Sequence, residues 1–172
     1  MNQYFGKALL SLIVGTTICA SVVYSDEPEQ RAAISLEAAR RQAEVLHDAM
    51  HASLQVVHHR YYTEDEGLPI PAAIFKDVFA DLEKEQHVKL RWLVVEGQAM
   101  NNDHKPQTPF EHEAVKALTS GKKSHEETEN GVYRRAGSIA LTNHCLKCHV
   151  PDRKNTNTRN AGLIITIPIA EK

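Results

Sequence analysis

The sequence predicts an α+β fold in which two long N-terminal helices pack on a small antiparallel sheet. Three observations support this class: an amphipathic segment without proline or glycine at residues 31–62, a tight-turn pair at Asn130-Gly131, and a β-branched segment at residues 161–169. The chain has 172 residues, of which 42% are hydrophobic and 24% are charged, and this composition fits one globular domain.

The two long helices come first along the chain. In the first, apolar residues recur at alternating spacings of three and four, which is the period of one helix face. These residues are Leu36, Ala39, Ala43, Leu46, Met50, Leu54 and Val57. The polar segment at residues 63–69 interrupts the pattern. The second helix is expected at residues 71–86, and Pro71 suits its first position because no helical partner exists there for an N–H group.

A strand and a third helix follow. Residues 88–95 are rich in β-branched and aromatic side chains, which predicts a strand. After a polar loop, Thr108 and Glu111 have the spacing of a capping box, in which each side chain bonds a backbone N–H group of the other residue. This helix is expected to run to about Ser120, where Gly121 is a natural stop.

The last third of the chain predicts three strands around a short stretch that contains two cysteines. Residues 124–129 and 132–141 flank Asn130-Gly131, the strongest short signal for a hairpin turn. The cysteine-containing stretch at residues 143–152 and a polar loop come next. Residues 161–169 then predict a last buried strand.

Residues 1–25 differ from the rest and are predicted to be a signal peptide. Lys7 is the only charged residue before Asp26, and Val23 and Ser25 supply the small side chains of a cleavage site. The alternative is an uncleaved membrane anchor, since the apolar run of about 16 residues is close to the shortest length that spans a bilayer. Cleavage would leave residues 26–172 as an exported, periplasmic domain.

The charge of the mature domain gives no sign of a nucleic-acid partner. The chain has 20 basic and 22 acidic residues, so removal of Lys7 leaves 19 minus 22, a net charge of −3, with no basic patch. Contact with a membrane is expected only through residues 1–25, if they are retained. Cys145 and Cys148 would be the only thiols of the mature domain, in an oxidising compartment.

The stretch NHCLKCHVPD at residues 143–152 carries the clearest chemical signal. Cys145, Cys148 and His149 match the C-x-x-C-H pattern for attachment of c-type haem. Two thiols one helical turn apart can each add to one vinyl group of the porphyrin, and the histidine can then bind the iron as the proximal ligand. One covalent haem per chain is therefore predicted.

Three other uses of the same residues are less consistent with the sequence. A disulfide between cysteines so close together closes too short a loop to stabilise a fold. A thioredoxin-like redox pair requires a βαβ unit, and the predicted order of helices and strands does not supply one. Zinc could bind His144, Cys145, Cys148 and His149, but a zinc finger also needs a second, spaced pair of ligands.

Histidines of the first helix could supply a second axial ligand to the iron. His47, His51 and His58 lie on one stripe beside the apolar face, with His59 next to the last of them. Met50, on the apolar face itself, is the other plausible type of ligand. Any single histidine on a helix surface is more often simply solvated. Four other histidines are expected to be exposed, namely His87, His104, His112 and His125.

Together with the order of the other segments, the motif resembles a family of single-haem periplasmic proteins and sensor input domains with a PAS-like fold and a c-type haem near the C-terminus. The resemblance covers residues 33–169. It rests on the long first helix, GLPIPAAIFKDVF, VKLRWLVVEGQAMNNDHKP, FEHEAVKAL, and CLKCH before a final strand. It implies that haem is attached at Cys145, Cys148 and His149.

The resemblance does not supply the distal ligand. Some members resemble a case in which a cysteine near the N-terminal helices binds the iron, and the mature chain has no cysteine outside the motif. If the first two helices form a hairpin, His58 falls opposite the second helix, close to where that cysteine is expected. His58 is therefore the first candidate for the distal ligand, ahead of His51 and Met50.

The resemblance implies a haem-based sensor of redox state or of a diatomic gas, which passes its signal to a partner protein. The alternative is a small periplasmic electron-transfer cytochrome, in which two strong protein ligands stay on the iron. Enzymatic turnover, such as peroxidase activity, is a lesser option, and the protein is expected not to be an enzyme. Fold analogy alone is a weak argument for any of these roles.

Overall fold

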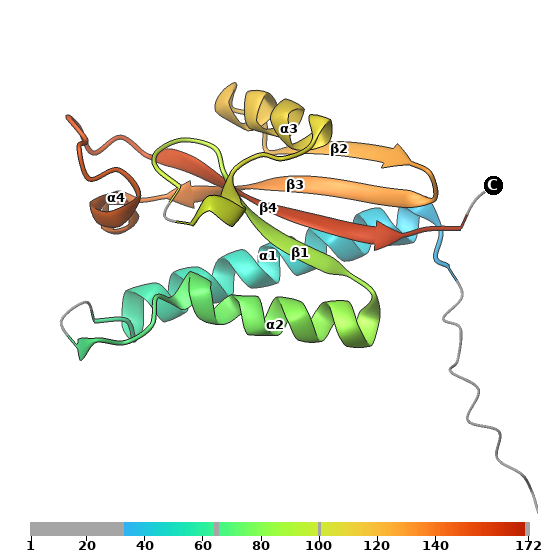
Figure 1. The fold of residues 1–172 in the computed structure, drawn as a ribbon, viewed down its shortest axis with the longest axis horizontal. Helices are drawn as coiled ribbons and strands as arrows, with labels where there is room; N and C mark the ends of the chain where they lie inside the picture. The colour runs from blue at the N-terminus through green and yellow to red at the C-terminus, as the bar shows by residue number, and fades with distance from the viewer. Residues whose placement is uncertain (1–32, 64–65, 100, 171–172) are drawn as a thin grey trace, which may run out of the picture. The chain divides into compact units, whose positions relative to one another are not determined.

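The computed structural model describes residues 33–63, 66–99 and 101–170, so the predicted signal peptide lies outside the described residues. Figure 1 shows the helices and strands, which are, in chain order, α1 (Leu36–Arg60), α2 (Pro71–Gln86), β1 (Lys89–Val94), η2 (Asn102–His104), α3 (Pro109–Thr119), β2 (Ser124–Glu129), β3 (Val132–Leu141), α4 (Asn143–His149) and β4 (Arg159–Pro168). The predicted α+β class is confirmed. Within the described ranges, no helix has the length and apolar character needed to cross a membrane.

The four strands form one antiparallel sheet in the order β1-β4-β3-β2. β4 is the last strand in the sequence but a central one in the sheet, between β1 and β3. Both faces of a central strand are covered, which explains why β4 is a nearly continuous apolar run and not a strict alternation. The turn between β2 and β3 has positive φ at Asn130 (49°) and Gly131 (69°), as a two-residue hairpin requires.

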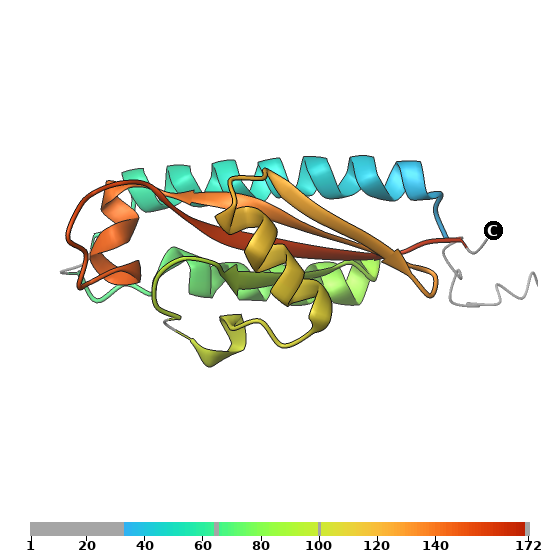
Figure 2. The same ribbon diagram turned by 90° about the horizontal axis from the view of Figure 1, so that it is seen from above.

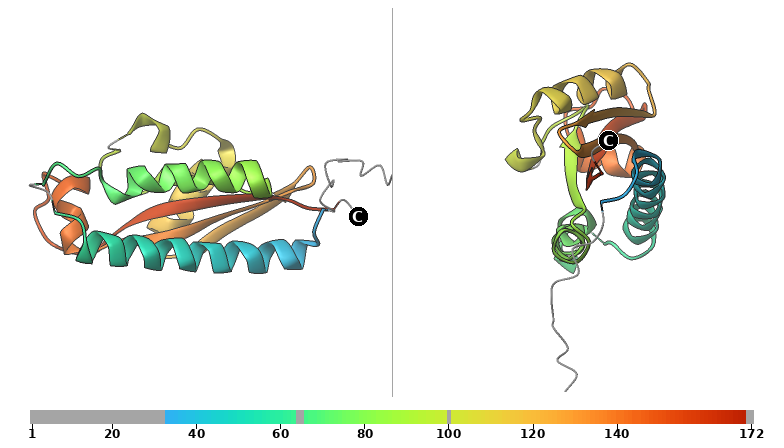
Figure 3. Two further views of the ribbon diagram at one scale, coloured as in Figure 1. Left: turned by 90° about the horizontal axis from the view of Figure 1, so that it is seen from below. Right: turned by 90° about the vertical axis from the view of Figure 1, so that its right-hand side faces the viewer.

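Helices cover both faces of the sheet, as Figures 2 and 3 show. α1 and α2 pack on one face, where the core includes Phe79 of α2, Trp92 of β1 and Leu163 of β4. α3 packs on the other face, where Leu118 meets Leu93 and Ile164. The two cores lie on opposite faces because successive side chains of a strand point in opposite directions, as Trp92 and Leu93 do.

The helices begin and end where the capping residues indicate, and the apolar pattern alone predicts these ends less well. α1 begins at Leu36 rather than near residue 31, because the side chain of Ser35 accepts a hydrogen bond from the N–H of Ala38 at 3.2 Å. Thr108 and Glu111 form the predicted capping box of α3. Gly121 follows α3 with a φ of 88°, the left-handed conformation that suits a helix stop.

The two ends of the β3–β4 pair carry different structures. α4 follows directly on the end of β3, where Leu141 pairs with Arg159. At the opposite end, Ile34 forms a parallel bridge with Ile169, and its carbonyl oxygen accepts a hydrogen bond from Ala170 at 2.9 Å. The entry to α1 and the exit from β4 are therefore joined at the end of the sheet remote from the cysteines.

Candidate functional site

The cysteine motif forms a helix of its own, α4, at the end of the sheet. Leu146, which is 1% exposed, anchors α4 to the core, and Cys145, on the neighbouring position, donates its N–H to the carbonyl oxygen of Thr142 at 2.8 Å. Cys145 is half-buried, Cys148 is exposed, and both are free thiols. Two unpaired thiols one helical turn apart can both react with a group that approaches from the outside of the protein.

His149, the last residue of α4, faces the protein interior. Burial lowers the pKa of its imidazole, and the charge of His58 lowers this pKa further. The neutral form of His149 is therefore favoured, and this is the form that binds a metal ion.

His149 lines a cavity between α1, α2 and the sheet. The lining residues are mostly apolar: Leu54, Ala72, Trp92, Leu93, Val94, Glu96, Gln98, Ala99, His104, Ile139, Leu141, His149, Ala161 and Gly162. The cavity volume is about 70 Å³. Pockets for large organic ligands measure about 300–1,000 Å³, so a group the size of a porphyrin requires the cavity walls to separate.

The wall next to α4 is the loop that follows β1. The N–H of Gln98 donates to the carbonyl oxygen of His149 at 2.9 Å. Gly97 has a φ of 106°, and a Cβ added there would lie 2.6 Å from the same carbonyl oxygen. The loop can therefore close on the end of α4 only because residue 97 has no side chain.

His104, on η2, lines the same cavity as His149, and the expectation that it is exposed is wrong. Its Nε2 atom is buried and has no hydrogen-bond partner among the described residues. Burial lowers its pKa, and the charges of Lys76, Arg91 and His149 lower it further, whereas that of Asp103 raises it. The cavity thus has two imidazoles, whose neutral form burial favours, in an otherwise largely apolar wall.

Arg91 of β1 holds η2 against the edge of the sheet. Its guanidinium group donates to the carbonyl oxygen of Asp103 and, at 3.4 Å, to that of Lys105. Glu111 of α3 holds the guanidinium group through an ion pair at 2.5 Å. Because these contacts join three separate elements, β1, η2 and α3, no local pattern around His104 predicts its burial.

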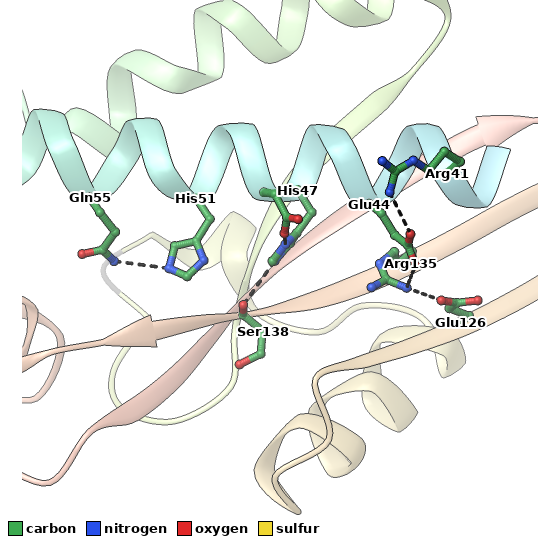
Figure 4. Close-up of polar contacts among 9 residues, drawn as sticks. Arg41, Glu44, His47, His51, Gln55, Glu126, Arg135 and Ser138 are labelled. Carbon is green, nitrogen blue, oxygen red and sulfur yellow. Dashed lines mark hydrogen bonds and ion pairs between the residues drawn. The ribbon is translucent and has the colours of Figure 1, made fainter. Parts of the chain in front are cut away.

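The lining of the cavity includes none of the four α1 histidines, and Figure 4 shows where two of them, His47 and His51, lie. His47 is buried, with Nε2 at 3.2 Å from the carbonyl oxygen of Ser138 and Nδ1 at 3.2 Å from Asp48. His51 is half-buried, and its Nε2 lies 3.5 Å from the side-chain nitrogen of Gln55. Burial, and then the charge of His47, lowers the pKa of His51.

The last turn of α1 lies near α4. The ring of His59 is 5.1 Å from that of His144, and His58 is close enough to lower the pKa of His149. The ring of His58 itself packs on Tyr62 at 5.1 Å. The structure therefore brings His58, but neither His47 nor His51, to the neighbourhood of the motif.

The structure agrees with the expected exposure of some of the remaining residues and differs for others. Met50 is partly buried and packs against the core between α1 and the sheet. His87 and His112 are exposed, as expected. His125 was expected to be exposed but is half-buried, because its ring packs on Phe110 at 5.3 Å. Across the described ranges, no group of three or more His, Cys, Asp or Glu residues could hold a metal ion by itself.

Comparison with known proteins places this arrangement in a family. The family model described as Tll0287-like: Tll0287 matches residues 30–163, which is most of the chain. Among solved structures, the crystal structure of the cyanobacterial heme-protein Tll0287 is similar, with a TM-score of 0.55 at 14% identity over 77% of this chain and 98% of that chain. No curated protein matches. The structural likeness shows a shared fold, and the family match shows that this chain belongs to the Tll0287-like family.

Proposed function

We propose that this protein binds one haem of the c type, held covalently by Cys145 and Cys148, with His149 as the proximal ligand of the iron. The observation that carries the proposal is the geometry of α4, which presents two free thiols one turn apart beside an imidazole in a largely apolar cavity. The solved structure with the same fold is that of a heme-protein, which supports the same cofactor here.

The haem would supply an iron that can change oxidation state and bind small ligands. The chain's own residues would fix and tune it. The two thioethers would tether it to α4, and the neutral imidazole of His149 would donate its nitrogen. Leu54, Trp92 and Ile139 would keep water from the inner face of the site, and such exclusion of solvent is one of the means by which a protein sets a haem potential.

Attachment is tested by extraction of the denatured protein with acid. The wild-type polypeptide is expected to keep its colour, because thioether bonds survive denaturation. Cys145→Ser combined with Cys148→Ser should remove the covalent haem, whereas His144→Ala, a matched change of a neighbouring residue, should leave it attached. Covalent haem in the double variant would refute the proposal.

The proposed location is the periplasm, with residues 26–172 as the mature domain. The support is the charge-poor apolar start of the chain and the small residues before Asp26. Mass spectrometry of the mature protein is expected to find an N-terminus at or near Asp26. An intact Met1 in the purified protein would contradict cleavage.

The proposed role is that of a redox or diatomic-gas sensor that signals to a partner protein and catalyses no reaction. A sensor must bind a ligand or an electron better in one protein state than in another. The cavity wall next to α4 supports this role, because it meets α4 through a backbone hydrogen bond from Gln98 to His149, which a change at the haem could break. A small electron carrier is the alternative, and it would keep both axial ligands in both oxidation states.

A further inference from the structure

We propose that the Nε2 atom of His104 would hold the iron as its second protein ligand, in addition to His149. This inference rests on the proposed attachment of haem to α4 and adds the opposite ligand. It assigns that role to a residue outside α1, where the sequence placed the candidates His58 and His51.

The lack of a hydrogen-bond partner at Nε2 of His104 supports the inference. Nε2 of His104 is buried without a hydrogen-bond partner among the residues described. A buried polar atom that has lost water and gained no partner destabilises the folded state. A bond to the iron would satisfy this nitrogen with the lone pair that a neutral imidazole offers.

The positions of His104 and His149 also support the inference. His104 and His149 come from separate elements, η2 and α4, and line one cavity whose other walls include Trp92, Ile139 and Leu141. Two imidazoles in the lining of one largely apolar cavity supply the two nitrogen donors that a haem iron with two protein ligands would need.

The α1 histidines are less suited to the role. Both ring nitrogens of His47 already have partners, Ser138 and Asp48. His51 has Gln55 within 3.5 Å and does not line the cavity. His58 lies near His149, but its ring packs on Tyr62 and it is not among the cavity residues.

Neighbouring side chains hold the segment around His104 in place. Arg91 binds the carbonyl oxygens of Asp103 and Lys105 on either side of it, and Lys76 forms an ion pair with Asp103 at 3.6 Å. Such fixed support is typical around ligands of a metal, because it sets the direction of the donor atom. Arg91 would thus be a positioning residue.

The test uses the purified protein with its haem attached, and its readout is the optical spectrum of the iron. The wild type is expected to be low-spin. His104→Ala should become high-spin, and added imidazole should restore the low-spin spectrum by filling the space left by the ring. His104→Met should stay low-spin with a raised reduction potential. The exposed control His112→Ala should match the wild type.

The outcomes separate this inference from the proposed function. Absence of covalent haem in the wild type would refute the function itself. Normal attachment with a low-spin spectrum in His104→Ala would refute only the inference, and loss of the low-spin spectrum in His58→Ala would then assign the ligand to α1. A high-spin spectrum of the wild type would also refute the inference. Circular dichroism shows whether each variant folds. If the alanine variant does not fold, the methionine variant still tests the inference.

Discussion

The imidazole of His47 occupies the space above Gly137, where any side chain on β3 would collide with it. Nε2 of the same ring lies 3.2 Å from the carbonyl oxygen of Ser138, the next residue of the strand (Figure 4). α1 can therefore approach the sheet closely at this point because β3 has a glycine there. His47 acts as a core residue that fixes α1 on β3.

Gly137→Ala is expected to destabilise the protein by about 1–3 kcal/mol, because the added methyl group overpacks a filled site. The free energy of unfolding in urea measures this effect. In a His47→Ala background the ring is absent, so the same substitution should cost much less. Equal costs in the two backgrounds would show that the His47–Gly137 contact does not set the packing.

Gly97→Ala is expected to move the loop after β1 away from α4. The new Cβ would lie 2.6 Å from the carbonyl oxygen of His149, and the φ of 106° is unfavourable for alanine. Gly121→Ala is the matched control, since its φ of 88° gives similar strain but nothing lies within 4 Å. Both variants should lose stability, but only Gly97→Ala should shift the haem spectrum and reduction potential. Identical spectra in the two variants would contradict a contact between this loop and the site.

Glu111→Gln is expected to remove part of the acid sensitivity of the protein. Burial raises the pKa of Glu111, but hydrogen bonds from Arg91, Gln107 and Thr108 lower it more, so the net pKa lies below the ordinary 4.5. A carboxyl group with a lowered pKa stabilises the fold above pH 4.5, and this stability is lost as the pH falls through its folded-state pKa.

The measurement is urea unfolding of the wild type and of Glu111→Gln at neutral pH and at a series of decreasing pH values below 4.5. The free energy of unfolding of the variant should be lower by about 1–3 kcal/mol at neutral pH, since a charge-assisted hydrogen bond to a buried group is lost. The two proteins should converge in acid. Glu113→Gln, which breaks an exposed pair with Lys116, should change little. A difference in unfolding free energy that stays constant across the pH range would contradict a lowered pKa of Glu111.

Binding of carbon monoxide or nitric oxide to the reduced protein is expected to displace the second axial ligand and to loosen the element that carries it. Hydrogen exchange with and without the gas locates that element. Loosening of residues 101–107 is expected if His104 is the ligand, and loosening of α1 if His58 is. No gas binding together with unchanged protection would favour the electron carrier.

The sequence predicts the elements well where the signal is local. The apolar period of α1, the capping box at Thr108 and Glu111, and the positive-φ pair at Asn130-Gly131 each need only a few neighbouring residues, and the structure has all three. The sequence cannot predict which histidines are buried, because that depends on distant partners. His47 is buried by a strand 91 residues away.

The same limit applies to the candidate site. The motif Cys145-x-x-Cys148-His149 is readable from spacing alone. The inward position of His104 depends on Arg91, and that of Arg91 depends on Glu111, which lies on another element. Neither contact has a sequence period, so only the folded chain reveals that His104 and His149 share a cavity.

The bridge between Ile34 and Ile169 has a practical consequence for electrochemistry. It lies at one end of the ten residue pairs that join β3 and β4, and α4 follows from the other end. At about 3.3 Å per residue, the two ends are separated by about 30 Å. A protein attached to an electrode near Ile34 or Ile169 would hold its cysteine helix away from the metal surface and exchange electrons slowly. Attachment beside α4 would bring the same helix to the electrode and allow fast exchange.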